Sequence, residues 1–376
     1  MRFSTKFCSA PLLILTALAG LLSGCDDMPK KSDTKISEFV VGSYAKENEP
    51  GIYRLQLDAI TGELSSLSEL VATVNPSYLT LSADKRRVFA VNETTKGGVT
   101  AFNWKSDQSA LLPFAQLSEL GDDPCYISLS PDGTMLAIAN YSSGDIRILK
   151  IADTTLTEIA AHKHQGKGSH VRQDAPHMHW IDWSPDGRFI YAIDLGLDEV
   201  SLYQLDGDTF LPAQVAIKLQ PEDGPRHMIF SEELGLAYLL TELSNQVVVL
   251  QQDKQTGKLT EIQRLSSLPV DFSDKSQAAA IKLSPAQDFL YVSNRGLNSI
   301  AVYAIDAQGK LSYLQNQSTG GNWPRDFVIS DDGEFLLVAN QLSNDITVLK
   351  RDNKSGLLKA TNNKITISQA TYISQL

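Results

Sequence analysis

The sequence predicts an all-β protein built from repeated units of four strands, and three observations support this prediction. A turn that begins with serine recurs along the chain, and its fullest form is Ser-Pro-Asp-Gly. Each turn leads into an apolar strand, and a strand rich in β-branched residues follows, as in L-A-I-A-N and then I-R-I-L. The spacing of the turn serines is 46 to 54 residues, at Ser82, Ser130, Ser184, Ser231, Ser284 and Ser330. Four strands in a period of this length are typical of a β-propeller blade.

The clearest copy of the repeat runs from Ala175 to Asp194 and reads A-P-H-M-H-W-I-D-W-S-P-D-G-R-F-I-Y-A-I-D. Proline at the second turn position presets φ, and Asp-Gly completes the turn. The flanking runs W-I-D-W and F-I-Y-A-I have the composition of strands, so this stretch predicts a β-hairpin.

Six turns account for six blades, and both ends of the chain supply the seventh. The segment Phe39–Leu57 matches the second and third strands of a blade but has no first strand before it. Residues Ala370–Leu376 resemble a first strand, with the same pattern as Cys125–Leu129. We therefore predict a seven-bladed propeller, residues 38–376, in which the C-terminal strand completes the N-terminal blade and leaves no open edge.

The N-terminal residues have the features of a bacterial export signal. Arg2 and Lys6 precede the apolar run Ala10–Leu22, and L-S-G-C then resembles the lipobox of bacterial lipoproteins. We expect residues 1–24 to be removed, Cys25 to be lipidated, and residues 25–37 to form a tether. Asp26 resembles an inner-membrane retention signal. The expected location is the cell envelope, on the periplasmic side of the membrane.

Charge and cysteine content limit the possible functions. The net charge of -11 argues against a nucleic-acid surface, which requires a basic face, but it allows a small anionic ligand held by a few arginines. Of three cysteines, only Cys125 would remain free after processing, so no disulfide framework is expected. The chain contains no P-loop, nucleophile elbow or dinucleotide fingerprint, and we expect no cofactor.

Candidate site residues follow from the strand order within a blade. The loop that enters the first strand and the loop that leaves the second must lie on one face, opposite the serine turn. Five residues before each serine stand Ser77, Cys125, His179, Arg226, Ala279 and Arg325. Eleven residues after it stand Glu93, Tyr141, Leu195, Glu242, Arg295 and Gln341, with Tyr44 in the first blade. Such a mixture of His, Arg and Glu at one mouth predicts an anion-binding or acid–base site, although a salt-bridged rim without activity is the alternative.

The residue types suggest particular roles. Arg226 and Arg295 are suited to gripping a carboxylate or phosphate with two hydrogen bonds. His177 and His179 are candidate general bases, because a neutral imidazole can activate water at neutral pH. Glu242 could assist the base or pair with an arginine. For substrate binding we name Arg325, Glu93, Tyr141, Tyr44 and Gln341.

All six histidines fall between His162 and His227, which raises the alternative of a metal site. His162, His164 and His170 lie among glycine and lysine in an expected loop, where no ligand geometry is implied, so we predict no metal site. Trp180, Trp183 and Phe189 are expected in the core rather than in ligand stacking.

Several of these stretches resemble the bacterial 6-phosphogluconolactonase-like family of seven-bladed propeller lactonases. They include V-N-E-T-T-K-G-G-V, A-P-H-M-H-W-I-D-W-S-P-D-G, G-P-R-H-M-I-F, T-E-L, S-N-R-G-L-N and W-P-R-D-F-V-I-S-D-D-G. The family also contains fungal enzymes that cyclise carboxy-muconate. The resemblance implies a channel lined by His179 or His177, Arg226, Arg295 and Glu242.

We therefore expect a hydrolase that opens a sugar lactone, with arginines binding its anionic group and a histidine activating water with help from Glu242. The expected partners are a small lactone or other anionic ligand and the membrane, through the lipid anchor. Muconate-lactone cyclisation is one alternative function. A membrane-anchored propeller that binds partners without catalysis is another.

Overall fold

The computed structural model describes residues 35–376, which form one propeller domain. The expected signal peptide, Cys25 and most of the expected tether lie outside these residues. The first strand, β1, begins at Ile36, two residues earlier than the predicted domain boundary. Within residues 35–376, no helix is long and apolar enough to cross a membrane.

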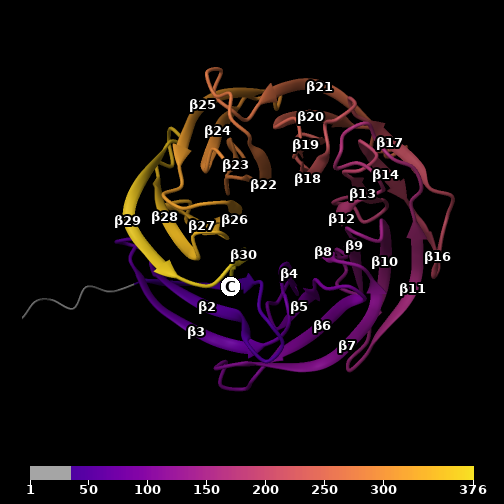
Figure 1. The fold of residues 1–376 in the computed structure, drawn as a ribbon, viewed down its shortest axis with the longest axis horizontal. Coiled ribbons are helices and arrows are strands. Elements are labelled where there is room, and N and C mark those ends of the chain that lie inside the picture. The colour runs from indigo at the N-terminus through magenta and orange to yellow at the C-terminus, as the bar shows by residue number, and fades with distance from the viewer. Residues whose placement is uncertain (1–34) are drawn as a thin grey trace, which may run out of the picture. The chain divides into compact units, whose positions relative to one another are not determined.

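Seven four-stranded antiparallel sheets are arranged in a ring (Figure 1), which confirms the predicted seven-bladed propeller. The bounds of the strands, from the inner to the outer strand of each blade, are as follows. Blade 1 contains β30 (Ala370–Gln375), β1 (Ile36–Ser43), β2 (Pro50–Asp58) and β3 (Leu64–Ala72). Blade 2 contains β4 (Leu79–Leu81), β5 (Arg87–Asn92), β6 (Gly97–Trp104) and β7 (Leu111–Gly121). Blade 3 contains β8 (Pro124–Leu129), β9 (Met135–Asn140), β10 (Asp145–Ile151) and β11 (Leu156–Lys163).

The remaining blades follow the same order. Blade 4 contains β12 (Met178–Trp183), β13 (Ile190–Asp194), β14 (Glu199–Tyr203) and β17 (Gln214–Lys218), with an inserted hairpin of β15 (Leu205–Asp206) and β16 (Thr209–Phe210). Blade 5 contains β18 (Pro225–Ser231), β19 (Leu236–Thr241), β20 (Gln246–Gln252) and β21 (Leu259–Ser266). Blade 6 contains β22 (Gln277–Leu283), β23 (Phe289–Arg295), β24 (Ser299–Ile305) and β25 (Leu311–Ser318). Blade 7 contains β26 (Pro324–Ile329), β27 (Phe335–Asn340), β28 (Asp345–Arg351) and β29 (Leu358–Thr366).

The two chain ends meet in blade 1, as the sequence predicted. Strand β30 pairs antiparallel with β1, so that Val41 faces Ile373 and Gly42 faces Tyr372. Figure 1 shows yellow β30 on the inner side of indigo β2 and β3. The ring is thereby closed by backbone hydrogen bonds, and the inner edge of β1 is not left open.

The serine turn owes its recurrence to local hydrogen bonds. In blade 4 the Ser184 hydroxyl donates to Asp186 Oδ1 (2.6 Å), while its oxygen accepts from the Phe189 N–H (3.0 Å). Gly187 has a φ of 71°, in the left-handed region that glycine enters without steric cost. Ser130 and Ser330 make the same bonds in their blades. The motif therefore closes a hairpin, and its sequence is explained by structure alone.

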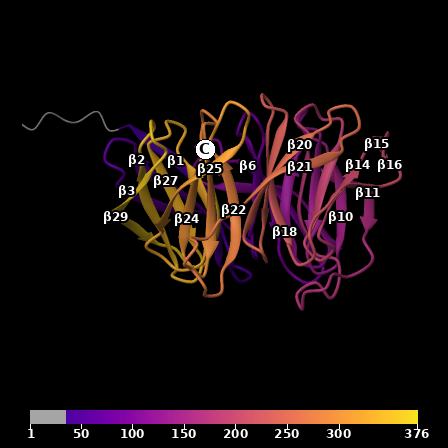
Figure 2. The same cartoon turned by 90° about the horizontal axis from the view of Figure 1, so that it is seen from above.

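The hydrophobic core lies between neighbouring blades. Phe89 and Val91 of β5, for example, pack against Ile127 of β8 and Ile138 of β9. Because both faces of a blade are covered, the second strands are largely buried, and in β27 all six residues are buried. Figure 2 shows the strands running between the two faces of the ring. The residues at the strand ends and in the connecting loops lie on these faces, where a site can form.

Candidate active site

In four blades, a bulge in the inner strand re-aims one side chain. The pairing of β12 with β13 skips His179, that of β18 with β19 skips Arg226, and that of β26 with β27 skips Arg325. Cys125 is skipped in the same way in blade 3. A bulge re-aims the extra residue relative to the regular pleat. In these four blades, the position five residues before the serine is therefore a bulge position, which the sequence could locate but not explain.

A buried carboxylate joins three arginines on this face. Glu242 follows β19, and its Oε2 lies 3.0 Å from Arg226 Nε and 2.7 Å from Arg295 Nη2. The other oxygen, Oε1, accepts from Arg172 Nη1. These four residues, here called the Glu242 cluster, carry three positive charges and one negative charge. The cluster therefore has an excess of positive charge in a buried setting.

The electrostatics of the Glu242 cluster keep it ionised. Burial alone would raise the pKa of Glu242, but the arginines, Arg295 first, outweigh burial and hold this pKa well below its usual value. Burial and the neighbouring Arg295 lower the pKa of Arg226 to about 10, which leaves it protonated at neutral pH. With both carboxylate oxygens in ion pairs, Glu242 is placed to anchor arginines rather than to accept a proton.

A second carboxylate lies across the mouth, on blade 2. Glu93 accepts hydrogen bonds from the Tyr44 hydroxyl (2.6 Å) and from the Ser77 hydroxyl. Arg325 Nη2 lies 3.6 Å from Glu93 Oε2, and its guanidinium stands over the Tyr44 ring at 5.2 Å. Residues from blades 1, 2 and 7 thus form one polar network.

The two candidate bases differ in their surroundings. His177 stacks on Tyr141 with ring centroids 4.4 Å apart, and its Nδ1 lies 3.1 Å from the Tyr141 carbonyl oxygen. This contact requires a proton on Nδ1, so the Nε2 of the neutral ring keeps its lone pair. Nε2 lies 3.5 Å from the exposed Asp174 carboxylate. His177 is therefore held in the tautomer that a general base needs.

His179 lies deeper in the channel. Burial, and then the charge of Arg226, hold its pKa well below the usual value. Its Nδ1 is buried without a hydrogen-bond partner, and the same is true of Gln341 Oε1 at the rim of blade 7. Unpaired buried polar atoms are uncommon and call for a partner such as water or a ligand.

An aromatic layer fills the channel below the mouth. Tyr78 lies 4.2 Å from Tyr126, 4.7 Å from Tyr372 and 6.1 Å from His227, between ring centroids. Tyr78 belongs to blade 2 and His227 to blade 5, which are not neighbours, so their contact means that the side chains meet across the channel axis. A cavity of about 280 Å³ lies beyond this layer, toward the serine turns. These aromatic side chains therefore lie between the Glu242 cluster and that cavity.

Comparison with known proteins assigns the family. A family model described as lactonase, 7-bladed beta-propeller, matches residues 38–375. The chain belongs to this family. The 6-phosphogluconolactonase of Bacillus subtilis is 33% identical over 322 residues, which cover 85% of this chain and 92% of that protein.

Solved structures of similar proteins have the same architecture. The periplasmic gluconolactonase of Pseudomonas aeruginosa is 34% identical, with a TM-score of 0.85, and the match covers 91% of this chain and 99% of that one. A protein from Lactobacillus plantarum is also 34% identical, with a TM-score of 0.84, and the match covers 91% of this chain and 100% of that one.

Most residues that the sequence singled out do meet at the mouth of this propeller lactonase. Arg226, Arg295 and Glu242 are in contact, His177 and Tyr141 are stacked, and Arg325, Glu93 and Tyr44 form the opposite network. Leu195 and Cys125 occupy equivalent register positions and are also buried, and burial raises the pKa of the Cys125 thiol well above its usual value. Trp180, Trp183 and Phe189 are buried as predicted.

Sequence reasoning missed Arg172 and gave Ser77 and His227 no role. Arg172 stands in the long connection between β11 and β12, outside the repeat, so counting from the turn serines could not reach it. Ser77 was in register with the site but is an ordinary residue type for a blade. His227 accepts from Arg226 Nη1 at Nε2 (3.1 Å), a contact that a bulge creates.

The prediction that His162, His164 and His170 all lie in a loop is partly wrong. His162 lies on β11, and His164 is buried, with its Nδ1 2.8 Å from Asp194 Oδ2 and its Nε2 against the Tyr203 hydroxyl. The pattern of glycine and lysine around these residues concealed a strand end. Within residues 35–376, no group of three or more His, Cys, Asp or Glu side chains is arranged to hold a metal ion.

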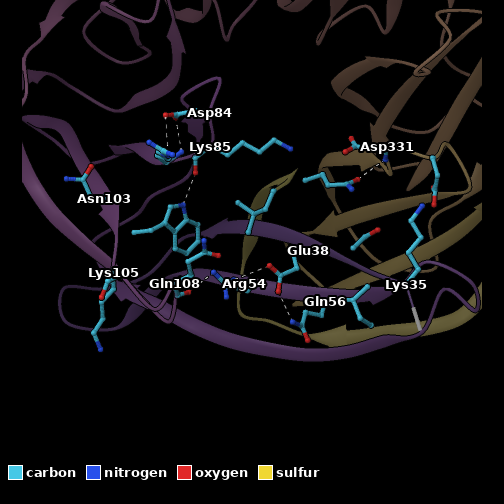
Figure 3. Close-up of a pocket in the computed structure, with 18 residues that line it drawn as sticks. Lys35, Glu38, Arg54, Gln56, Asp84, Lys85, Asn103, Lys105, Gln108 and Asp331 are labelled. Atoms are coloured by element: carbon cyan, nitrogen blue, oxygen red, sulfur yellow. Dashed lines mark hydrogen bonds and ion pairs between the residues drawn. The ribbon is translucent and has the colours of Figure 1, made fainter. Parts of the chain in front are cut away.

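A wider cavity, of about 990 Å³, opens on the opposite face (Figure 3). Its lining includes the turn residues Asp84 and Asp331, and Glu38 pairs with Arg54 at its edge. Positive and negative side chains both line the cavity, with ion pairs between Arg54 and Glu38 and between Arg86 and Asp84, and no histidine lines it. Its size alone does not make it the site, and the candidate residues lie at the other face.

Proposed function

We propose that this protein hydrolyses a sugar lactone at the mouth formed by the Glu242 cluster and His177. The observation that carries the proposal is the excess positive charge of that cluster beside an imidazole of defined tautomer. The names of the Bacillus subtilis and Pseudomonas aeruginosa relatives support it.

In the proposed mechanism, the arginines bind the substrate and stabilise the charge that develops on it. Attack of water on a lactone carbonyl moves negative charge to the carbonyl oxygen, and fixed guanidinium groups nearby lower the energy of that state. Arg226 and Arg295 are held by Glu242, so their orientation needs no rearrangement during the reaction. In this mechanism, Glu242 orients the two arginines. It does not assist the general base, which was the role that we expected from the sequence.

The general base is assigned to His177. Its Nε2 lone pair can take the proton of the attacking water, and Asp174 would stabilise the imidazolium that results. When the ring C–O bond then breaks, the imidazolium returns this proton to the leaving alkoxide oxygen, so that the opened product carries a carboxyl and a hydroxyl group. The lowered pKa of His179 makes it a weaker base, and its position below Tyr141 fits contact with the bound ring.

The other predicted residues would orient the sugar. Gln341 offers an unused acceptor for a hydroxyl group, and Tyr44, Tyr141, Glu93 and Arg325 surround the same opening. Hydroxyl-rich substrates supply the donors that such acceptors require.

We also propose that the protein acts in the cell envelope, anchored through Cys25 with residues 1–24 removed. The signal features L-S-G-C and the periplasmic location in the name of the Pseudomonas aeruginosa relative support this. Metabolic labelling with a fatty acid, compared between the wild-type chain and Cys25→Ala, tests the anchor.

The function is tested by lactone hydrolysis with the chain from Asp26 onward. We expect Arg226→Ala to lower kcat/KM by about 10²–10³, the usual cost of losing one charge-stabilising donor. Arg86→Ala is the matched control, because it removes an exposed arginine at the 990 Å³ cavity. No turnover of phosphorylated or neutral sugar lactones by folded wild-type protein would contradict the proposal and favour the non-catalytic scaffold.

A further inference from the structure

The connection from His164 to His177 is the longest between an outer strand and the next inner strand. Its backbone is fixed by Gln173, which is fully buried and donates from Nε2 to the Leu195 carbonyl (2.8 Å) and to Asp198 Oδ1 (2.7 Å). Gly168 N–H in turn donates to the Gln173 carbonyl (2.8 Å). Arg172 therefore projects toward the mouth from an anchored segment.

Arg172 is the only arginine of the Glu242 cluster that solvent reaches well. Its side chain is 36% exposed, whereas those of Arg226 and Arg295 are 2% and 6% exposed. A ligand that enters the mouth meets Arg172 before it meets the buried pair.

The three arginines also differ in how firmly the protein holds them. Arg226 Nη1 donates to the Ala279 carbonyl, and Arg295 donates to the carbonyls of Gln277 and Ala278. The guanidinium of Arg172 contacts only side chains of the mouth, Glu242 Oε1 and the Tyr141 hydroxyl (3.1 Å). Backbone contacts fix Arg226 and Arg295, whereas Arg172 can exchange one partner for another.

Glu242 tolerates that exchange. If Arg172 turns to a ligand, Oε2 keeps both buried arginines, so the carboxylate stays paired. Oε1 then becomes free to accept a hydrogen bond from a hydroxyl of the same ligand. The cost of breaking one ion pair is offset when the ligand supplies both an anionic group for Arg172 and a donor for Oε1.

We propose that Arg172 is a specificity-determining residue that binds an anionic substituent of the substrate, apart from the lactone group. The proposal rests on the lactonase function given above and deepens it by assigning the residue that distinguishes charged from neutral sugar lactones. Loss of Arg172 should therefore weaken turnover of a lactone with a phosphoryl or carboxylate group more than turnover of a neutral one.

The experiment measures kcat and KM for three lactones with the full chain. They are 6-phosphoglucono-δ-lactone, glucaro-1,4-lactone, which carries a carboxylate, and neutral glucono-δ-lactone. We expect Arg172→Gln to lower kcat/KM for a charged lactone by roughly ten- to a hundredfold, mainly through KM, and to change the neutral lactone less than threefold. The charged lactone that loses more identifies phosphoryl or carboxylate as the group recognised.

Two further variants separate charge recognition from structure. Lys167→Gln removes an exposed positive charge from the same segment and should leave the preference unchanged. Arg172→Lys should restore part of the charged-lactone activity, because it keeps the charge without the planar fork. Equal losses for charged and neutral lactones in Arg172→Gln, or no loss for either, would overturn the proposal, since a merely structural role predicts one of these results.

Product binding distinguishes failure of this proposal from failure of the proposed function. Calorimetry compares 6-phosphogluconate with gluconate in the wild type and Arg172→Gln. Absence of turnover with phosphogluconate binding that depends on Arg172 would refute the lactonase function and support the anion site. Turnover of all three lactones with equal efficiency in both proteins would support the function and refute the role of Arg172.

Discussion

Deleting the C-terminal strand should unfold the whole propeller rather than loosen one end. The deletion removes Ala370–Leu376 and exposes the inner edge of β1, where Phe39, Val40 and Val41 are fully buried. The ring would then have an open edge and a gap beside blade 7, with which β30 also packs through Ile373.

The magnitude follows from what the strand buries. Tyr372 and Ile373 are 7% and 1% exposed, and burying two such side chains contributes roughly 3–6 kcal/mol. Each backbone hydrogen bond of the β1–β30 ladder adds roughly 0.5–1.5 kcal/mol net. The total is on the order of 5–10 kcal/mol, which is comparable to the entire stability of a typical domain, about 5–15 kcal/mol.

Thermal unfolding followed by tryptophan fluorescence measures whether the loss of structure spreads beyond blade 1. The fluorescence reports on other blades, because none of the four tryptophans lies in blade 1: they are Trp104, Trp180, Trp183 and Trp323. A deletion of Gln375 and Leu376 alone is the control. It removes the Leu376 N–H bond to the Glu38 carbonyl (2.8 Å) but leaves Tyr372 and Ile373 in place, so it should cost only about 1 kcal/mol. A seven-residue deletion that melts within a few degrees of this control would refute the closure argument.

Three further predictions concern the channel. Glu242→Gln should cost about 3–5 kcal/mol of unfolding free energy at pH 7, because it leaves buried arginines without their counter-charge. The pKa of Glu242 is lower in the folded state, so below about pH 4.5 the unfolded chain binds more protons at this group than the folded chain does. Denaturant titrations should therefore show that the difference in unfolding free energy between the wild type and Glu242→Gln shrinks as pH falls. Burial raises the pKa of Asp182 to about 7 from 3.8, so wild-type stability falls as pH rises through that interval, and Asp182→Asn should raise Tm more at pH 8 than at pH 4. His177→Asn should lower kcat by about 10²–10⁴ and exceed the effect of His179→Asn, whereas the opposite order in steady-state kinetics would assign the base to His179.

The repeat, the blade count and the ring closure could be predicted from the sequence because local interactions encode them. The Ser184 and Asp186 hydrogen bonds are made within a few residues, so the same letters recur wherever the same turn is built. Strand patterns are equally local, and counting from the serines then placed Arg226, Glu242 and Arg325 on one face. Symmetry of the blades made that step reliable, because equivalent positions in a propeller border the same mouth.

Only the tertiary structure decided how those residues act together. The bulges that turn His179 and Arg226 toward the channel depend on pairing between strands, and the tautomer of His177 depends on a carbonyl from another blade. Arg172 lies 70 positions from Glu242 in the chain and outside the repeat, so no spacing could connect the two. Local chemistry thus determined the scaffold, whereas contacts between distant segments determined which side chains are paired, which are exposed and which keep a free hydrogen-bonding atom.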